Sequence, residues 1–298
     1  MNGVPTVTLN NGVQMPQLGL GVWQAKDGEE VESAVLAALE VGYRLIDTAA
    51  VYGNETGVGR AIAKSGVPRD ELFVTTKLWN SDQGYDKTLD AFDKSLTRLG
   101  LDYIDLYLIH WPVPAAGKMV ETWRAFEQLY SDKKVRAVGV CNFTPQHLEL
   151  LMHDTAVVPA VNQIELHPRF TQQETRDFCK VHGIQVESWS PIGGGGGDLL
   201  SEPLLKEIGD KYGKSPAQTV IRWHLQNELV VIPKSTHSAR IAENFDVFDF
   251  ELSDDDMNAM RSLDTESRVG ADPDTMNAGV PLGLAQFAHK LGLVKWRK

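Results

Sequence analysis

The feature that most constrains the fold of this chain is an alternation of short apolar segments with amphipathic segments, from about residue 19 to residue 262. The amphipathic segment at 29–42 places Val31, Ala34, Val35, Ala38 and Leu39 on one helical face. About eight strand-then-helix units in tandem predict an α/β fold, a (β/α)8 TIM barrel, with a doubly wound open sheet as the alternative. The expected strands lie at 17–23, 43–49, 72–78, 104–111, 135–143, 157–166, 184–190 and 229–235.

The composition does not shift along this series, so we expect one barrel domain over residues 1–298. Before the barrel, VTLNNGVQMP predicts a β-hairpin at about 5–16, with Asn11-Gly12 as its two-residue turn, which would plug one barrel end. After the barrel, we expect residues 265–298 to wrap over the surface as a C-terminal tail. Three helix starts are predicted where a hydroxyl precedes a proline or an acidic turn, at Thr144, Ser215 and Ser253.

Charge and composition exclude several classes of protein. The formal net charge of −11 argues against a general nucleic-acid surface. The N-terminus does not resemble a secretory signal, and no apolar run approaches the ~18 residues of a membrane span, so we expect a cytoplasmic protein. Cys141 and Cys179 are expected to be free thiols, and no cluster has metal-ligand spacing. We expect a monomer.

Polar or aromatic residues stand at the carboxyl end of each expected strand. In a TIM barrel these ends and the loops after them form the active-site face, so such residues would line one pocket. In chain order they are Trp23, Asp47, Lys77, His110, Asn142, Gln163, Trp189 and Lys234.

Four of the residues at this face suit proton transfer to an oxygen. Tyr52 follows Asp47 in the loop after the strand at 43–49. A lysine ammonium such as Lys77 lowers the pKa of a nearby tyrosine hydroxyl, an aspartate holds the lysine in place, and His110 would orient a carbonyl oxygen. Each residue also has a structural interpretation: a buried ion pair for Asp47 and Lys77, a strand-closing histidine, and a packed tyrosine ring.

Protonation of an oxygen that gains negative charge is what carbonyl reduction requires, and the hydride must come from a cofactor. Asn142 and Gln163 are suited to bond a nicotinamide carboxamide, and Trp189 to stack on its ring, or to serve as a core aromatic. Lys234, Ser235 and Arg240 cluster at a strand-to-helix junction. This cluster favours NADPH over NADH, or is a solvated helix start.

The residues described so far lie in motifs of one family. The chain resembles the aldo-keto reductases from the hairpin to about Asp264, and most of all the bacterial 2,5-diketogluconic acid reductase group. The matching segments are GYRLIDTAAVYGNE, FVTTKLW, LDYIDLYLIHWP, VGVCNF, PAVNQIELHP and IPKSTHSARIAEN.

The resemblance implies an NADPH-dependent reductase of aldehydes or ketones, with small dicarbonyls, diketo acids or sugar-like carbonyls as substrates. It implies a catalytic tetrad of Asp47, Tyr52, Lys77 and His110, in which Tyr52 is the proton donor. Two residues depart from the family pattern: Cys141 stands where serine is frequent, and Trp189 where tyrosine is frequent. The implied cofactor contacts are Asn142, Gln163, Trp189, Ser190, Ile192, Lys234, Ser235, Arg240, Glu243 and Asn244, and the implied substrate contacts are Trp23, Trp79 and Trp111.

Two other functions remain open from the sequence. One is a sensor or regulatory subunit that binds NADPH with little turnover, and the other is a barrel lyase or isomerase using the same tyrosine and lysine. Five consecutive glycines, Gly193 to Gly197, lack the spacing of a Walker or Rossmann loop. The resemblance implies that they form a strap over the cofactor pyrophosphate, mobile without NADPH and ordered with it.

Overall fold

The computed structural model describes residues 4–194, 198–276, 284 and 286, and its centre is a parallel eight-stranded sheet in the order β10-β9-β8-β7-β6-β5-β4-β3. Parallel bridges from Leu18 to Val231 and from Gly21 to Lys234 join the first and last strands. The (β/α)8 barrel is therefore confirmed. The strands are β3 (Gly19–Gly21), β4 (Leu45–Asp47), β5 (Phe73–Leu78), β6 (Ile104–Ile109), β7 (Val135–Cys141), β8 (Val161–Glu165), β9 (Gln185–Trp189) and β10 (Val230–Val231).

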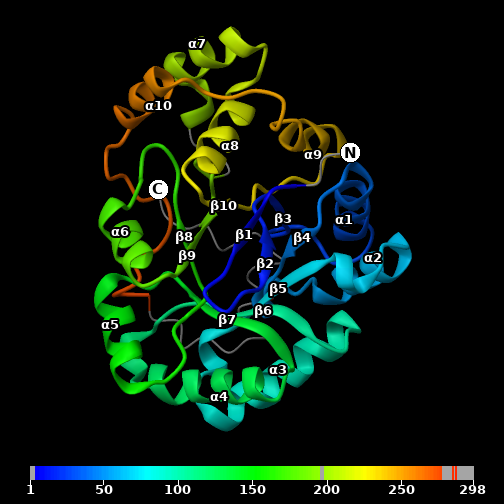
Figure 1. Ribbon diagram of the computed structural model, residues 1–298. Helices are drawn as coiled ribbons and strands as arrows, with labels where there is room; N and C mark the ends of the chain where they lie inside the picture. Colours follow the sequence, from blue (N-terminus) through cyan, green and yellow to red (C-terminus); the bar gives the residue numbers. More distant parts are fainter. Residues whose placement is uncertain (1–3, 195–197, 277–283, 285, 287–298) are drawn as a thin grey trace.

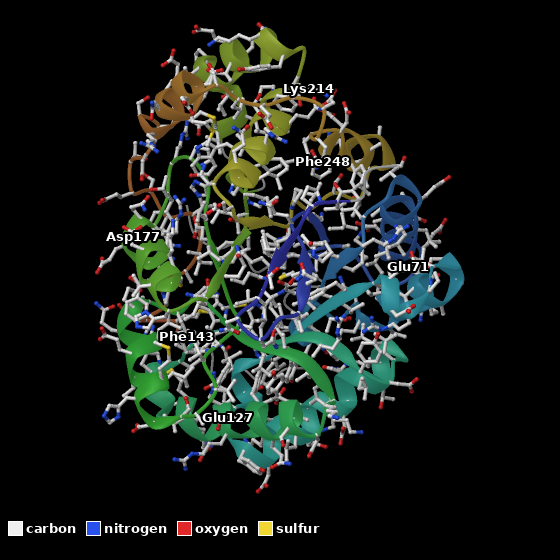
Figure 2. All side chains as sticks on the ribbon, viewed as in Figure 1. Glu71, Glu127, Phe143, Asp177, Lys214 and Phe248 are labelled. Atoms are coloured by element: carbon white, nitrogen blue, oxygen red, sulfur yellow. The ribbon has the colours of Figure 1, made fainter. Side chains whose placement is uncertain are left out.

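Side chains fill the inside of the barrel because alternate strand residues face inward. On β6, Leu106 and Leu108 belong to the interior cluster, whereas Tyr107 and Ile109 pack toward the helices. Small residues make room for large ones: a Cβ on Gly139 would lie 2.7 Å from Leu108 Cδ2. Figure 2 shows side chains throughout the interior and in the layer between strands and helices.

Helices surround the strands in Figure 1. The predicted apolar face of 29–42 is confirmed, since its five apolar residues are all buried in α1. The three predicted helix starts are confirmed too, because Thr144, Ser215 and Ser253 each form a capping box. The helices are α1 (Glu29–Val41), α2 (Glu55–Ser65), α3 (Tyr85–Leu99), α4 (Met119–Ser131), α5 (Pro145–Asp154), α6 (Gln173–Val181), α7 (Pro203–Tyr212), α8 (Pro216–Gln226), α9 (Ser238–Phe245) and α10 (Asp254–Arg261).

The N-terminal hairpin pairs β1 (Thr6–Thr8) with β2 (Gln14–Pro16) and lies across the ring of strands in Figure 1. Its buried Leu9 and Met15 join the interior cluster, so the predicted plug is confirmed. The predicted two-residue turn is wrong. Leu9 N–H donates to Val13 O at 2.9 Å and Gly12 N–H to Leu9 O at 2.8 Å, which gives a three-residue loop, 10–12, with Gly12 at φ 86°.

The loop after β9 and the C-terminal tail are described only in part. Of the five glycines, Gly193 and Gly194 have φ of 83° and 76°, and residues 195–197 lie outside the described residues. The tail is described over 265–276, whereas most of 277–298 lies outside. In the described ranges, no helix combines the length and apolar character needed to cross a membrane. The same residues hold no group of three or more His, Cys, Asp or Glu able to bind a metal ion.

Candidate active site

A buried ion pair lies at the carboxyl ends of β4 and β5. Lys77 Nζ donates to Asp47 Oδ1 at 2.5 Å and to the carbonyl oxygen of Thr48 at 2.9 Å. The side chains of Lys77 and Asp47 are only 0% and 3% exposed. The structural interpretation of this pair therefore holds, but Lys77 Nζ also lies 3.5 Å from the Tyr52 hydroxyl, to which it donates. The ammonium group is thus in contact with the predicted proton donor.

A short helical turn brings Tyr52 back to the barrel mouth. Tyr52 ends the turn Ala50–Tyr52, five residues after Asp47. Thr48 Oγ1 donates to Asn54 Oδ1 at 2.8 Å, and Asn54 Nδ2 donates to the backbone oxygens of Val22 and Ala25 at 2.9 and 3.0 Å. Because Asn54 is fully buried, these bonds tie the loop after β4 to the segment that follows β3.

Burial and charge act on these groups in opposite directions. Burial lowers the pKa of Lys77, but the electrostatic effects of its neighbours, with the Asp47 carboxylate first among them, together outweigh burial, so the Lys77 pKa is raised and the ammonium stays charged. Burial raises the pKa of Tyr52, and the opposing effect of Lys77 is smaller. The expectation that the pKa of Tyr52 falls below its ordinary value is therefore wrong for this structure. The hydroxyl is protonated at neutral pH, as a proton donor must be.

Aromatic rings enclose His110 at the end of β6. The Tyr52 and His110 rings meet edge to face with centroids 5.8 Å apart, and the Trp79 and His110 rings do so at 5.5 Å. Trp79 and Trp111 are buried in an apolar cluster with Tyr52 and Trp189 packed against it. The predicted substrate residue Trp23 is half-buried and is not a member of that cluster. The structure thus groups two of the three predicted tryptophans around His110.

The two predicted carboxamide-binding amides lie side by side, one just after β7 and the other on β8. Asn142 follows β7 with φ 63°; its Nδ2 donates to the carbonyl oxygen of His110 at 3.0 Å, and its Oδ1 accepts from Trp189 Nε1 at 2.9 Å. Gln163 on β8 donates from Nε2 to Asp47 Oδ2 at 2.8 Å. Within the described residues, one N–H of Asn142 and Oε1 of Gln163 are then left to meet a ligand, the complement of a primary carboxamide.

Gln163 also contacts a second carboxyl group, that of Glu187, which was not identified from the sequence. The fully buried Glu187 on β9 accepts from Gln163 Nε2 at 2.8 Å through its Oε2. Burial and then the nearby Asp47 charge raise the pKa of Glu187 to about 8, against the weaker effects of Gln163 and Lys77. The available signal was an acidic residue two positions before Trp189, on the inward-facing side of a buried strand.

The predicted phosphate-binding residues surround the start of α9. Lys234 is half-buried, Ser235 is buried and Arg240 is exposed, and neither cation forms an ion pair with any carboxylate of the described residues. Ser235 Oγ accepts from His237 N–H at 3.1 Å and so shapes the turn into the helix. Burial lowers the pKa of Lys234. Asn244 is buried and Glu243 is exposed, one turn further along α9.

The loop after β9 begins with Ser190, at φ 49°, and the partly buried Ile192. A Cβ on Gly193 would lie 2.9 Å from Leu199 Cβ, so glycine permits a close approach within this loop. Asp198, at the far end of this loop, accepts a hydrogen bond from Arg169, whose other terminal nitrogen donates to Glu202. The strap prediction for residues 195–197 itself lies outside the described residues.

A buried carboxylate, that of Glu165, holds the C-terminal tail at the barrel mouth, and it was not identified from the sequence. The fully buried Glu165, at the end of β8, accepts from the backbone N–H of Val269 at 2.5 Å and of Gly270 at 2.8 Å. A Cβ on Gly270 would lie 2.3 Å from Trp189 Cη2, so the tail backbone touches the Trp189 ring. Ala271 and Met276 pack against the aromatic cluster around His110. Residues 269–276 therefore form part of the wall at this face.

Comparison with known proteins assigns the chain to a family. The Aldo/keto reductase family matches residues 17–265. The chain is 55% identical over 271 residues to the glyoxal reductase of Bacillus subtilis, covering 91% of this chain and 97% of that protein. It is 52% identical over 271 residues to the methylglyoxal reductase DkgA of Escherichia coli, with coverage of 91% and 98%.

A solved structure extends the likeness to three dimensions. The structure of a Gox0644 mutant in complex with NADPH is 48% identical, covers 92% of this chain and 99% of its own, and superposes with a TM-score of 0.87. The family resemblance seen in the sequence motifs is thus confirmed. With the barrel, the hairpin plug and the family match together, the chain belongs to the aldo/keto reductase family.

Proposed function

We propose that the protein is an NADPH-dependent reductase that converts small aldehydes and ketones to alcohols. The single observation that carries the proposal is the contact of a buried, charge-paired Lys77 with the hydroxyl of Tyr52 at the barrel mouth. This contact couples a proton donor to a fixed positive charge at the face where barrel enzymes carry out chemistry. Membership of the family supports the same reaction class.

The residues at the mouth fit NADPH. Asn142 offers an N–H donor and Gln163 an Oε1 acceptor, which match the two ends of a carboxamide, and the half-buried Trp189 offers a ring face beside them. Lys234 and Arg240 have no carboxylate partner among the described residues and suit a 2′-phosphate. When bound, the cofactor supplies the hydride for reduction of the carbonyl carbon.

The side chains of the protein then hold the carbonyl oxygen and donate the proton to it. The substrate oxygen sits between the Tyr52 hydroxyl and the His110 ring; the centroids of the Tyr52 and His110 rings are 5.8 Å apart. As negative charge develops on that oxygen, Tyr52 donates its proton to it. The charged Lys77 stabilises the tyrosinate that forms, and Asp47 keeps the ammonium 3.5 Å from the hydroxyl. The high pKa of Tyr52 in this structure keeps the proton in place until that charge develops.

Small dicarbonyls are the proposed substrate class. The two bacterial relatives are a glyoxal reductase and a methylglyoxal reductase, and both align with almost this entire chain. Trp79 and Trp111 are buried in the wall of the site, and the tail residues Ala271 and Met276 pack against the same cluster. An aromatic wall beside the polar groups Tyr52 and His110 suits a compact substrate with adjacent carbonyl groups.

We also propose that the protein works as a cytoplasmic monomer. Both cysteines, Cys141 and Cys179, are buried free thiols, which is consistent with a reducing compartment. Light scattering on a sizing column tests the oligomeric state: a monomer has a mass of 33.0 kDa. Twice that mass would refute the monomer.

The reaction is tested by following NADPH absorbance with a panel of glyoxal, methylglyoxal, diketo acids and aromatic aldehydes. We expect oxidation of NADPH with the dicarbonyls, and a much lower kcat/KM with NADH because Lys234 and Arg240 find no 2′-phosphate. Tight NADPH binding without oxidation by any carbonyl would favour the sensor alternative. Proton exchange or elimination without oxidation of NADPH would favour the lyase or isomerase.

A further inference from the structure

We propose that Glu187 is a positioning residue, which fixes the amide of Gln163 in the orientation that receives the nicotinamide carboxamide. The inference rests on the proposed function, since it gives Gln163 a role in NADPH binding. Glu187 lies on β9 directly beside Gln163 on β8, in register with it. Its carboxyl group points into the barrel and is fully buried.

The hydrogen bonds of Gln163 carry this inference. An amide nitrogen has two N–H donors, and Gln163 Nε2 lies 2.8 Å from Asp47 Oδ2 and 2.8 Å from Glu187 Oε2. Both donors are thus used by carboxyl oxygens. Rotation of the amide by 180° would place Oε1 against the Asp47 carboxylate and would take both N–H donors away from the two carboxyl groups, so the two contacts together favour the observed orientation. That orientation presents Oε1 to a ligand as a hydrogen-bond acceptor.

Asp47 alone would leave the amide less restrained. A hydrogen bond to Asp47 alone would use one N–H of the Gln163 amide. The second N–H could then bond another acceptor, such as the carbonyl oxygen of a bound ligand. Glu187 removes that option because it takes the second N–H inside the barrel. The other carboxyl oxygen, Glu187 Oε1, is buried and meets no hydrogen-bond partner in the described part of the chain. Its contact with Gln163 is therefore the one hydrogen bond that the Glu187 carboxyl group makes there.

Burial, reinforced by the Asp47 charge, favours the neutral form of Glu187 at neutral pH. Asp47 from β4 and Lys77 from β5 act on Glu187 electrostatically, and Glu187 in turn helps to raise the pKa of the Cys141 thiol from β7. One positive charge on Lys77 is already paired with Asp47, and burial raises the pKa of Glu187 to about 8. A glutamine at this position would have nearly the same shape and would keep an oxygen for Gln163. Leucine would fill the space without an acceptor.

The test compares Glu187→Leu with Glu187→Gln, using the Kd for NADPH from tryptophan quenching, steady-state kinetics with methylglyoxal, and thermal unfolding. We expect Glu187→Leu to weaken NADPH binding about tenfold, the order of one hydrogen bond. KM for NADPH should rise more than kcat falls, since saturating cofactor selects the productive amide orientation. Glu187→Gln should restore Kd to within about twofold of wild type at pH 7.

Thr75→Val is the matched control. Thr75 lies on the inward face of β5 in the same interior, and its Oγ1 is buried with no partner among the described residues. Thr75→Val tests the loss of an interior polar atom that forms no hydrogen bond with Gln163, and the Kd for NADPH should stay unchanged.

The outcomes separate this inference from the proposed function. Wild type that binds and oxidises NADPH, with Glu187→Leu matching its Kd, would overturn the positioning role alone. A shift in Tm with no change in Kd would do the same, because it would mark a structural role only. Failure of Glu187→Gln to restore binding would also overturn it. Wild type that does not bind NADPH would overturn the positioning role together with the proposed function.

Discussion

Replacement of Lys77 by methionine tests the buried ion pair from two sides, stability and chemistry. The side chain lies within the barrel interior, and its ammonium is 2.5 Å from a carboxylate that is 3% exposed. Lys77→Met keeps most of the volume but leaves Asp47 as a buried charge without a cation. Removing one partner of a buried pair costs about 3–5 kcal/mol, a large part of a stability of roughly 5–15 kcal/mol.

The loss of stability in Lys77→Met should depend on pH and on the ionisation of Asp47. Burial already raises the pKa of Asp47 with the lysine in place, so without Lys77 the carboxyl group takes up a proton more readily. Protonation relieves the unpaired charge, and the cost should therefore be smaller at pH 5.5 than at pH 7.5. The double variant Lys77→Met/Asp47→Asn removes the charge altogether and should recover most of the stability at pH 7.5.

Urea unfolding followed by tryptophan fluorescence measures these free energies, and NADPH oxidation with methylglyoxal measures activity. Both variants should lose most of their turnover, because Tyr52 no longer has a positive charge beside its hydroxyl. Wild-type stability of Lys77→Met at pH 7.5 would refute the reasoning about the pair. Wild-type turnover in the double variant would refute the catalytic role of Lys77.

Three further predictions concern other parts of the site. Lys234→Ala/Arg240→Ala should raise KM for NADPH by ten- to a hundredfold, roughly 1.4–2.8 kcal/mol, with KM for NADH little changed; an equal loss with both cofactors would contradict a 2′-phosphate site. Gly270→Ala places a Cβ 2.3 Å from the Trp189 ring, so the tail must move and the KM for the carbonyl substrate should change. The free energy of unfolding in urea should stay within about 1 kcal/mol of wild type. Unaltered kinetics across the carbonyl panel would exclude the tail from the substrate site. The pKa of Glu187 is near 4.5 in the unfolded chain and about 8 in the folded one, so the stability of the wild type should fall as pH rises between these values, by at most about 1.4 kcal/mol per pH unit. Glu187→Gln should flatten that slope when unfolding is measured as a function of pH. Parallel slopes for the two proteins would contradict the burial of a protonated carboxyl group.

The sequence predicted the barrel because strand and helix periods are local properties. Each strand end could be located from a few neighbouring residues, and the parallel topology then places Asp47, Lys77 and His110 on one face. The helix starts were predictable for the same reason, since a capping residue such as Thr144 acts within one turn.

The remaining features depend on distances across the fold. Glu165 meets the N–H of Val269, which is 104 residues further along the chain, so no local pattern marks it as an anchor for the tail. Glu187 could be assigned to the inward face of its strand, but its contact with Gln163 needs the register of two strands. The net pKa shift of Tyr52 depends on how completely the barrel mouth buries it, which charge spacing in the sequence does not reveal.

The hairpin turn shows a limit of dipeptide signals. Asn11-Gly12 is typical of two-residue turns, but only Gly12 has positive φ, and the register of the strands leaves three residues in the loop. The pairing of Val7 with Met15 keeps Met15 and Leu9 in the barrel interior. Burial of these two side chains thus decides the register over the local turn preference.

The most direct test of the central claim is Tyr52→Phe, measured for NADPH binding and for single-turnover oxidation of NADPH by methylglyoxal. The substitution removes the hydroxyl that Lys77 Nζ reaches at 3.5 Å and retains the ring that packs edge to face with His110. We predict a loss of about 10²- to 10⁴-fold in the rate of the chemical step, with Kd for NADPH within about twofold of wild type. Wild-type rates in this variant would contradict the assignment of Tyr52 as the proton donor.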